Sequence, residues 1–152
     1  MLTYMDINTR NIGYKERRYI EELRILTRSV ALDCISDERF DRLIYIIKKG
    51  DMGLAIGKSG ENIKKMQKVL GMKVEMVEFD ENRDIFIKNL FKPADILEIV
   101  SHEEEKKIDI ILKSKSDLGI VIGKGGCNIE KARMACRRIA ACEIGEIKTE
   151  GQ

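Results

Sequence analysis

The sequence predicts an α+β fold in which one small unit occurs twice. The first observation is a repeated stretch, because Leu54–Ile63 and Ile120–Ile129 align without a gap when Gly57 is placed on Gly123. The second is the chain length of 152 residues, which is enough for two small domains. The third is that both halves show the same order of helix-like and strand-like segments. A repeat of this length indicates one supersecondary unit used twice.

Composition favours a folded globular chain without a strong overall charge. Hydrophobic residues make up 43% of the sequence and charged residues 36%, which excludes a disordered chain. The 28 basic side chains nearly balance the 26 acidic ones, so the net charge is only +2. Any nucleic-acid binding must therefore come from local clusters of charge and not from a general attraction for polyanions.

The sequence carries no recognisable membrane or secretion signal. No apolar run approaches the roughly 18 residues of a membrane span, and no basic stretch followed by an apolar one opens the chain. We therefore expect a cytoplasmic protein with no membrane partner. In that compartment the four cysteines are expected to be reduced and mostly buried, since they follow no metal spacing. They are Cys34, Cys127, Cys136 and Cys142, of which Cys127 is the candidate for exposure because it follows the second glycine pair.

Residue periodicity divides the first half, residues 13–80, into six segments after a loose arm at residues 1–12. A helix is predicted from Tyr14 to Val30 because apolar residues recur there every three or four positions. The continuous apolar run Leu43–Ile47 predicts a strand buried on both faces. The other expected segments are a strand at 31–35, a single helical turn at 52–56, a helix that Gly71 ends, and a strand at 72–79.

The second half, residues 81–150, repeats this order. The expected segments are a helix at 84–91 broken by Pro93, strands at 96–100 and 108–112, a short helix at 117–122, a long helix after the loop, and a strand at 143–148. The long helix is expected to turn Ile129, Ala132, Cys136 and Ile139 inward. His102, the only histidine, is interpreted as a surface residue without a carboxylate, serine or cysteine partner.

The two loops Gly57-Lys58-Ser59-Gly60 and Gly123-Lys124-Gly125-Gly126 are the strongest candidates for function. A tight reversal between two helices needs backbone angles that a β-carbon resists, so glycine at both ends is the low-strain solution. The free amides at the start of the following helix carry partial positive charge and can hold a phosphate. A lysine at the tip of each loop adds a mobile positive charge.

These residues resemble a known family. Ile-Gly-Lys-x-Gly-x-x-Ile, set between helices and strands, is similar to the KH domain, which clamps single-stranded nucleic acid by its backbone. The helix and strand before each core resemble the type II arrangement. The resemblance therefore implies two tandem type II KH domains, each α-β-β-α-α-β, with a three-stranded sheet and helices packed on one face. The pair resembles the KH domains of the NusA family, and the second loop is especially similar to that family's second KH domain.

The resemblance covers roughly residues 14–149, with one departure. Bacterial members of the family carry a polymerase-binding domain and an S1 domain ahead of the KH pair, and this sequence shows neither. It resembles the shorter archaeal-type members instead. RNA polymerase is therefore a weaker candidate as a partner than RNA.

By this resemblance, the residues expected to contact RNA form two groups. The first is the two loops: Gly57, Lys58, Ser59, Gly60, Gly123, Lys124, Gly125 and Gly126. The second group lies nearby: Leu54, Asn62, Lys65, Ile120, Asn128 and Lys131. The apolar members could support a base, and the lysines could extend a phosphate track or form an ordinary solvated helix face. The two asparagines could bond a phosphate or base, or cap the first turn of their helix.

The first loop also imitates the end of a nucleotide-binding P-loop, and this interpretation is rejected. That motif needs a glycine five positions before the Gly57 position, where the sequence has Met52. The second loop has Gly125 where a magnesium-binding hydroxyl would be required. We expect no catalytic residues, no cofactor and no metal site.

The NusA resemblance implies a non-enzymatic factor that acts in transcription elongation or termination by holding nascent single-stranded RNA. We expect a monomer. Two alternatives stay open at this stage. One is a tandem KH factor in ribosome assembly or RNA decay, which composition cannot separate from a transcription factor. The other is a protein-interaction adaptor in which both glycine loops are purely structural.

Overall fold

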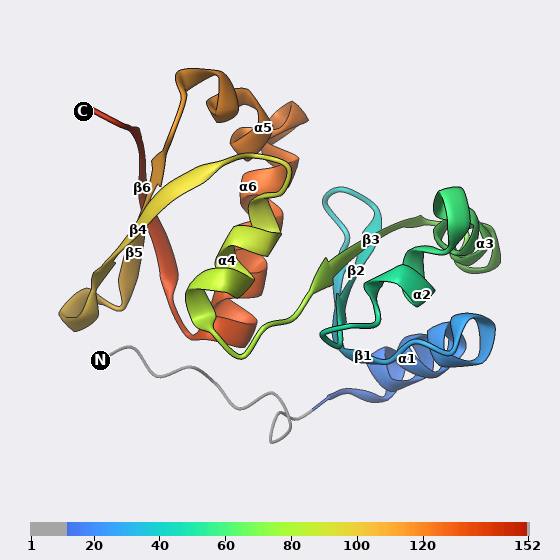
Figure 1. Cartoon of the computed structure of the whole chain (residues 1–152). Coiled ribbons are helices and arrows are strands. Elements are labelled where there is room, and N and C mark those ends of the chain that lie inside the picture. Colours follow the sequence, from blue (N-terminus) through green and yellow to red (C-terminus); the bar gives the residue numbers. More distant parts are fainter. Residues whose placement is uncertain (1–11, 152) are drawn as a thin grey trace. The chain divides into compact units, whose positions relative to one another are not determined.

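The computed structural model describes residues 12–151, which divide into two compact units at residues 12–80 and 81–151. Each unit has the element order helix, strand, strand, helix, glycine loop, helix, strand, and this confirms the predicted α+β class (Figure 1). Except for Ile12, the predicted arm at residues 1–12 lies outside the described residues. Over residues 12–151, no helix is both long enough and apolar enough to cross a membrane.

The first unit contains one three-stranded mixed sheet with its helices. The elements are α1 (Tyr14–Thr27), β1 (Ala31–Asp37), β2 (Arg42–Ile47), α2 (Met52–Ile56), α3 (Glu61–Leu70) and β3 (Lys73–Glu78). Strand β2 is central, antiparallel to β1 and parallel to β3. Parallel neighbours cannot be joined by a tight hairpin, so the chain crosses over between them through α2, the glycine loop and α3 (Figure 1).

The core of the first unit is built on β2. All six of its residues are buried, as the continuous apolar run predicts. Alternate side chains Leu43, Tyr45 and Ile47 form one cluster with Leu23 of α1 and Met66 of α3. Each such burial contributes about 1.5–3 kcal/mol. The Tyr45 hydroxyl keeps a hydrogen bond in this core, since it donates to the carbonyl of Tyr19 at 2.8 Å.

One charged cluster is also buried in the first unit. Arg42, with only 2% of its surface exposed, donates to Asp37 at 2.8 Å and to Glu75 at 2.9 Å. Burial by itself would lower the pKa of Arg42, but the hydrogen bonds that Arg42 donates to Glu75 and Asp37 outweigh it and raise that pKa. The three side chains come from β2, the end of β1 and β3, so the cluster ties the three strands together.

The predicted extension of the first helix to Val30 is wrong. Helix α1 ends at Thr27, because Arg28 adopts a left-handed conformation with φ of 63° and its amide closes the helix on the carbonyl of Arg24. Val30 keeps the helical spacing in sequence, but it lies beyond the helix and is 37% exposed. Its amide bonds instead with the Asp51 carboxylate at 2.8 Å.

The second unit repeats this architecture. Its elements are α4 (Arg83–Phe91), β4 (Ile96–His102), β5 (Lys107–Leu112), α5 (Leu118–Ile122), α6 (Cys127–Ala135) and β6 (Glu143–Thr149). Strand β5 is central, antiparallel to β4 and parallel to β6. The four positions of the long helix that were predicted to face inward are all buried. The last of them belong to a π-helical turn, Cys136–Ala140, that continues α6.

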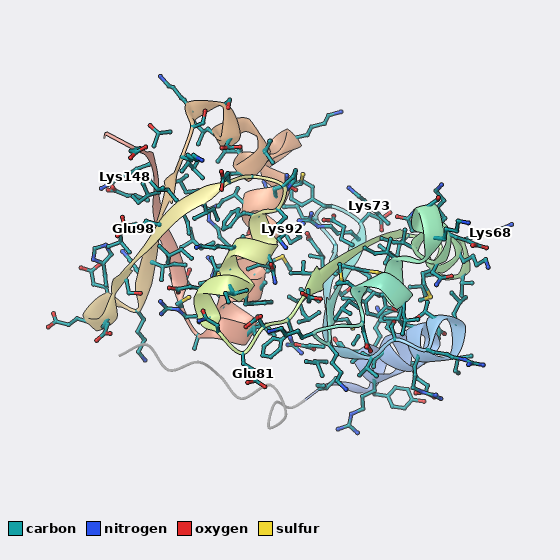
Figure 2. The ribbon with its side chains drawn as sticks, in the orientation of Figure 1. Lys68, Lys73, Glu81, Lys92, Glu98 and Lys148 are labelled. Atoms are coloured by element: carbon teal, nitrogen blue, oxygen red, sulfur yellow. The ribbon has the colours of Figure 1, made fainter. Side chains whose placement is uncertain are left out.

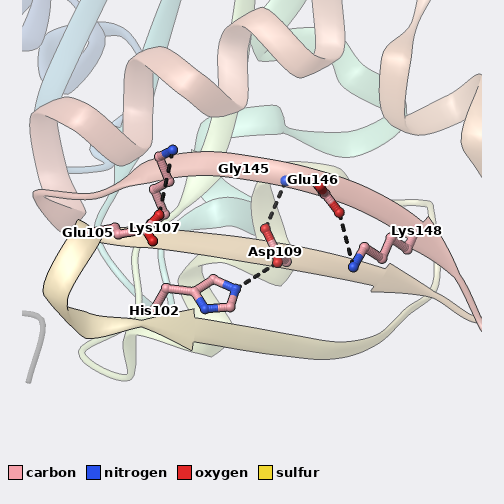
Figure 3. Close-up of a pocket in the computed structure, with 7 residues that line it drawn as sticks. All are labelled: His102, Glu105, Lys107, Asp109, Gly145, Glu146 and Lys148. Carbon is pink, nitrogen blue, oxygen red and sulfur yellow. Dashed lines mark hydrogen bonds and ion pairs between the residues drawn. The ribbon is translucent and has the colours of Figure 1, made fainter. Parts of the chain in front are cut away.

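The third strand of the second sheet contains a bulge, whereas β3 in the first sheet pairs with β2 without a register shift. Ile144 and Ile147 of β6 pair with Ile108 and Ile110 of β5, so two residues of β6 lie opposite Asp109 alone. The Asp109 carboxylate accepts the amide of Glu146 at 2.8 Å and meets Nε2 of His102 at 2.7 Å (Figure 3).

The sequence-based interpretation of His102 is therefore half right. The side chain is exposed, but it does have a carboxylate partner, because the β4–β5 hairpin brings residues seven apart in sequence side by side. Partial burial would raise the pKa of Asp109, but the hydrogen bonds from His102 and the Glu146 amide outweigh it and lower that pKa. A β-carbon on Gly145 would lie 2.5 Å from an oxygen of this carboxylate, so the bulge also needs glycine there.

Candidate nucleic-acid interface

The first glycine loop reverses the chain between α2 and α3. Gly57 has φ of 76° and ψ of 169°, and Gly60 has φ of 74°, both in the region that glycine occupies without strain. Gly57 is also fixed by space, because a β-carbon there would lie 2.8 Å from Cγ and 2.9 Å from the backbone nitrogen of Asn62. At Gly60 the nearest atom to such a carbon is 3.7 Å away, so only its conformation favours glycine.

The second loop has the same geometry. Gly123 has φ of 75° and ψ of 170°, and Gly126 has φ of 83°. A β-carbon on Gly123 would lie 2.8 Å from Cγ of Asn128, whereas one on Gly126 would have its nearest neighbour at 3.9 Å. At the first glycine of each loop, both the backbone conformation and the lack of space for a β-carbon require glycine. At the last glycine of each loop, only the backbone conformation favours it.

The paired asparagines have a role that the sequence analysis did not anticipate. Nδ2 of Asn62 donates to the carbonyl of Leu54 at 2.8 Å, and Nδ2 of Asn128 donates to the carbonyl of Ile120 at 2.7 Å. Each asparagine thus ties the start of the second helix to the last turn of the first, across the glycine loop. The signal in the sequence was the shared eight-residue offset between asparagine and apolar residue in both copies.

Backbone amides remain available at the tip of each loop. In the first loop, hydrogen bonds use the amides of Gly57, Gly60 and Glu61, which donate to Gly53, Gly57 and Lys58. None of these bonds uses the amide of Lys58 or Ser59, and both residues are exposed. The second loop has the same pattern, in which Gly123, Gly126 and Cys127 donate to Gly119, Gly123 and Lys124. These tips stand at the N-termini of α3 and α6, where helix dipoles favour an anion.

An apolar side chain borders each loop. Leu54 on α2 is 52% exposed and Ile120 on α5 is 38% exposed, whereas their neighbours Ala55 and Val121 are fully buried and anchor the two short helices. Each unit therefore presents an apolar surface one helical turn from a positively charged loop. This combination suits a nucleotide, which needs a seat for its phosphate and a non-polar contact for its base.

The lysines around the loops differ in what they contact. Lys58 and Lys124 are exposed at the loop tips. Lys65 forms an ion pair with Glu61 at 3.1 Å on the first turn of α3, and Lys131 is half-buried on α6. Lys68 extends from α3 into solvent (Figure 2). Because Lys65 already has an acidic partner, the loop tips carry the more available positive charge in the first unit.

Two glycine loops, one in each α-β-β-α-α-β unit, each with available amides, a lysine at the tip and an apolar neighbour, define a tandem KH protein. A KH domain family model matches residues 19–93, and a model described as the NusA-like second KH domain matches residues 83–149. The chain belongs to the NusA-like family of tandem KH proteins. This confirms the predicted family and the predicted likeness of the second unit to the second KH domain of NusA.

Relatives cover both units. A probable transcription termination protein NusA of Halobacterium salinarum is 29% identical over 130 residues, which cover 86% of this chain and 92% of that protein. A probable transcription termination protein NusA of Methanocaldococcus jannaschii is 32% identical over 108 residues, covering 70% of this chain and 58% of that protein. A solved structure titled "Crystal structure of APE1850" has a TM-score of 0.81 at 33% identity and covers 91% of this chain and 100% of that one.

Proposed function

We propose that this chain is a non-enzymatic RNA-binding factor that holds single-stranded nascent RNA in its two KH units during transcription elongation or termination. The observation that carries the proposal is that both loops follow the same left-handed backbone path, with exposed residues and available amides at the same two positions. A purely structural connector would not need that path twice. The relatives are named as probable transcription termination proteins, and this supports transcription as the cellular process.

The loop amides are assigned to phosphate binding. Amides of Lys58 and Ser59 in one unit, and of Lys124 and Gly125 in the other, would donate to phosphate oxygens, and the two lysine side chains would add charge. Leu54 and Ile120 would then lie against the adjacent base or ribose. In this proposal, Lys65 and Lys131 extend the phosphate track along the second helix of each unit.

The two asparagines are proposed as positioning residues. Asn62 donates a hydrogen bond to the carbonyl of Leu54, and Asn128 donates one to the carbonyl of Ile120. Each asparagine also packs against the first glycine of its loop. They therefore set the separation between the phosphate seat and the apolar contact. A base-specific bond from their remaining amide oxygen is not required by this proposal.

Binding at two sites on one strand would strengthen the interaction. Once one loop holds the RNA, engagement of the second becomes intramolecular and can raise affinity about 10²- to 10⁴-fold. We propose a cytoplasmic monomer that acts this way on emerging transcripts. RNA polymerase is the proposed protein partner, with RNA as the primary ligand.

The loops are tested by reversing their charge. Lys58→Asp with Ser59→Asp, combined with Lys124→Asp and Gly125→Asp, should abolish binding of a single-stranded RNA in fluorescence anisotropy, because carboxylates would occupy both phosphate seats. Each loop pair changes the charge by three, so a matched control is Lys92→Asp with Lys106→Asn, which makes the same change away from the loops. Lys106 already has φ of 53°, a conformation that asparagine tolerates.

The control should bind RNA almost as the unaltered chain does, and all variants should keep their circular dichroism. RNA binding that survives the combined loop changes would contradict the proposal and favour the protein-interaction adaptor. Crosslinking in cells, followed by sequencing of the attached RNA, separates the cellular roles. Fragments spread along nascent transcripts support the transcription role, whereas fragments confined to pre-ribosomal or decaying RNA support the alternative.

A further inference from the structure

A pair of cysteines meets where α6 ends in the second unit. The helix closes with the π-helical turn Cys136–Ala140, and Ala141 then takes a left-handed conformation with φ of 52°. The carbonyl of Cys136 accepts the amide of Ala141 and also that of Cys142, the latter at 3.2 Å. These two hydrogen bonds to one carbonyl bring residue 142 back next to residue 136. A side-chain contact across such a helix end is usual, but here both partners are thiols.

The two thiols interact directly. Cys136 is fully buried and Cys142 is 3% exposed, and their side chains share a hydrogen bond. This bond, with the nearby Arg83 guanidinium, lowers the pKa of Cys142, while the same bond and burial raise the pKa of Cys136. Cys142 is therefore the thiol that ionises first and would act as the nucleophile.

The Cys142 end of the pair borders a hollow in the surface. Cys142 lines this shallow hollow together with Lys106, Arg137, Ala141 and Glu143. A small oxidant can enter such a hollow without unfolding the unit. Cys136 is fully buried and does not line this hollow.

We propose that Cys136 and Cys142 form a reversible, redox-active pair that peroxide closes to an intramolecular disulfide. The Cys142 thiolate attacks one peroxide oxygen, the O–O bond breaks, and hydroxide leaves, so that Cys142 becomes a sulfenic acid. The Cys136 sulfur then attacks the Cys142 sulfur. The S–O bond breaks, and the departing hydroxide takes the thiol proton of Cys136 as water. In sum, two thiols and one hydrogen peroxide give one disulfide and two waters.

The cross-link would fasten the end of α6 to the start of β6. It lies at the opposite end of the long helix from the Gly123–Gly126 loop, which precedes Cys127. The inference therefore stands independently of RNA binding. It adds a modification site to the second unit that has no equivalent in the first, where the only cysteine is Cys34.

The order of residues allows a direct test by peptide mapping. Arg137 and Arg138 lie between the two cysteines, so trypsin separates them into the peptides 134–137 and 139–148. The folded, full-length chain is exposed to hydrogen peroxide, blocked with an alkylating agent, digested and analysed by mass spectrometry. We expect the two peptides to be joined by a disulfide, and to separate again after treatment with dithiothreitol.

Two variants sharpen this test. Cys127→Ser should leave the joined peptides unchanged, because Cys127 is not part of the pair. Cys136→Ser should abolish them and leave Cys142 to oxidise alone. The proposal is overturned if the peptides stay separate in the oxidised folded chain, if they join only after denaturation, or if Cys142 instead pairs with the peptide 125–131 that contains Cys127. Since mapping of the unaltered chain alone decides between these outcomes, a variant that fails to fold does not prevent the test.

Discussion

The two glycine loops follow one backbone path from different residues. At the third position the first loop has Ser59 with φ of 55° and ψ of 30°, and the second has Gly125 with φ of 65° and ψ of 14°. A residue with a β-carbon is strained in this region by about 1–2 kcal/mol, and glycine is not. The first unit therefore tolerates strain to reach the geometry that the second reaches without it. Both units share the first glycine, the lysine and the asparagine clamp, by which we mean the hydrogen bond from Asn62 to the Leu54 carbonyl or from Asn128 to the Ile120 carbonyl.

The two loops therefore share the position of their amides and not the side chain at the third position. If the amides hold phosphate, both loops should contribute to binding in the same manner despite Ser59 and Gly125. Substitutions made in parallel in the two units test this equivalence.

The largest effect should be on the salt dependence of RNA binding. With roughly 4–6 phosphate contacts, the logarithm of affinity should fall with the logarithm of salt concentration at a slope of about −3 to −4. Reversing charge in either loop alone, by Lys58→Asp with Ser59→Asp or by Lys124→Asp with Gly125→Asp, should roughly halve that slope. Anisotropy titrations at several salt concentrations measure it. A slope that changes for one loop only would break the equivalence of the two units.

The next effect concerns the first glycine of each loop. Gly57→Ala and Gly123→Ala should each destabilise the chain by about 2–3 kcal/mol, because the new β-carbon meets the asparagine backbone and the φ angle is unfavourable. Gly60→Ala is the matched control, since its β-carbon has room and only the φ angle opposes it. Its cost should stay near 1 kcal/mol. Urea denaturation gives all three values, and equal costs would contradict the steric argument.

The asparagine clamps should have a smaller, equal effect in the two units. Asn62→Ala and Asn128→Ala each remove a hydrogen bond to the carbonyl of the apolar neighbour, at a cost of about 1 kcal/mol. RNA affinity should fall as well, because the apolar side chain is then free to shift relative to the loop. Affinity that falls without any loss of stability would instead indicate direct contact between the asparagine and RNA.

A still smaller effect should distinguish the third loop positions. Gly125→Ser should destabilise the second unit by about 1 kcal/mol, because serine is strained where glycine is not. Ser59→Gly should be neutral or slightly stabilising, since relief of strain is offset by greater freedom of the unfolded chain. Both variants should keep most of their RNA affinity. A large loss of affinity in Ser59→Gly would show that the hydroxyl itself binds RNA.

The smallest effect should appear in acid and only in the second unit. The pKa of Asp109 is lowered in the folded chain, so its contribution to stability is present above the ordinary aspartate pKa and is lost as pH falls through the lowered value. Asp109→Asn should remove that part of the pH dependence and leave the remainder. Urea denaturation of both proteins across acidic pH compares the two profiles, and identical profiles would contradict the assignment.

Much of the fold could be predicted because the repeat and the apolar periodicity are local signals. The buried run Leu43–Ile47, the two short helices and the glycine loops all lie where their sequence patterns place them. The end of α1 was mistaken because Val30 keeps helical spacing, while a left-handed Arg28 had already ended the helix. Spacing alone does not contain that backbone conformation.

The contacts that sequence reasoning missed all depend on chain geometry. The Asp109–His102 pair needs the register of a hairpin, and the asparagine clamp needs the loop reversal to bring two helices together. The contact between Cys136 and Cys142 needs a π-helical turn, whose extra residue per turn leaves no mark in the apolar pattern. In each case the residues were visible in the sequence, and their proximity was not.

The crossover between parallel strands has a consequence for the rate of RNA capture. In both units the glycine loop lies midway along the crossover that joins two parallel strands of one sheet, so both ends of the crossover are fixed. An asparagine hydrogen bond joins the two helices on either side of the loop. The protein therefore has little to rearrange when a ligand arrives, and the ordering cost of the encounter falls on the RNA. Flexible, unpaired RNA strands should associate fastest, and RNA that must first open a hairpin should associate at the rate of that opening.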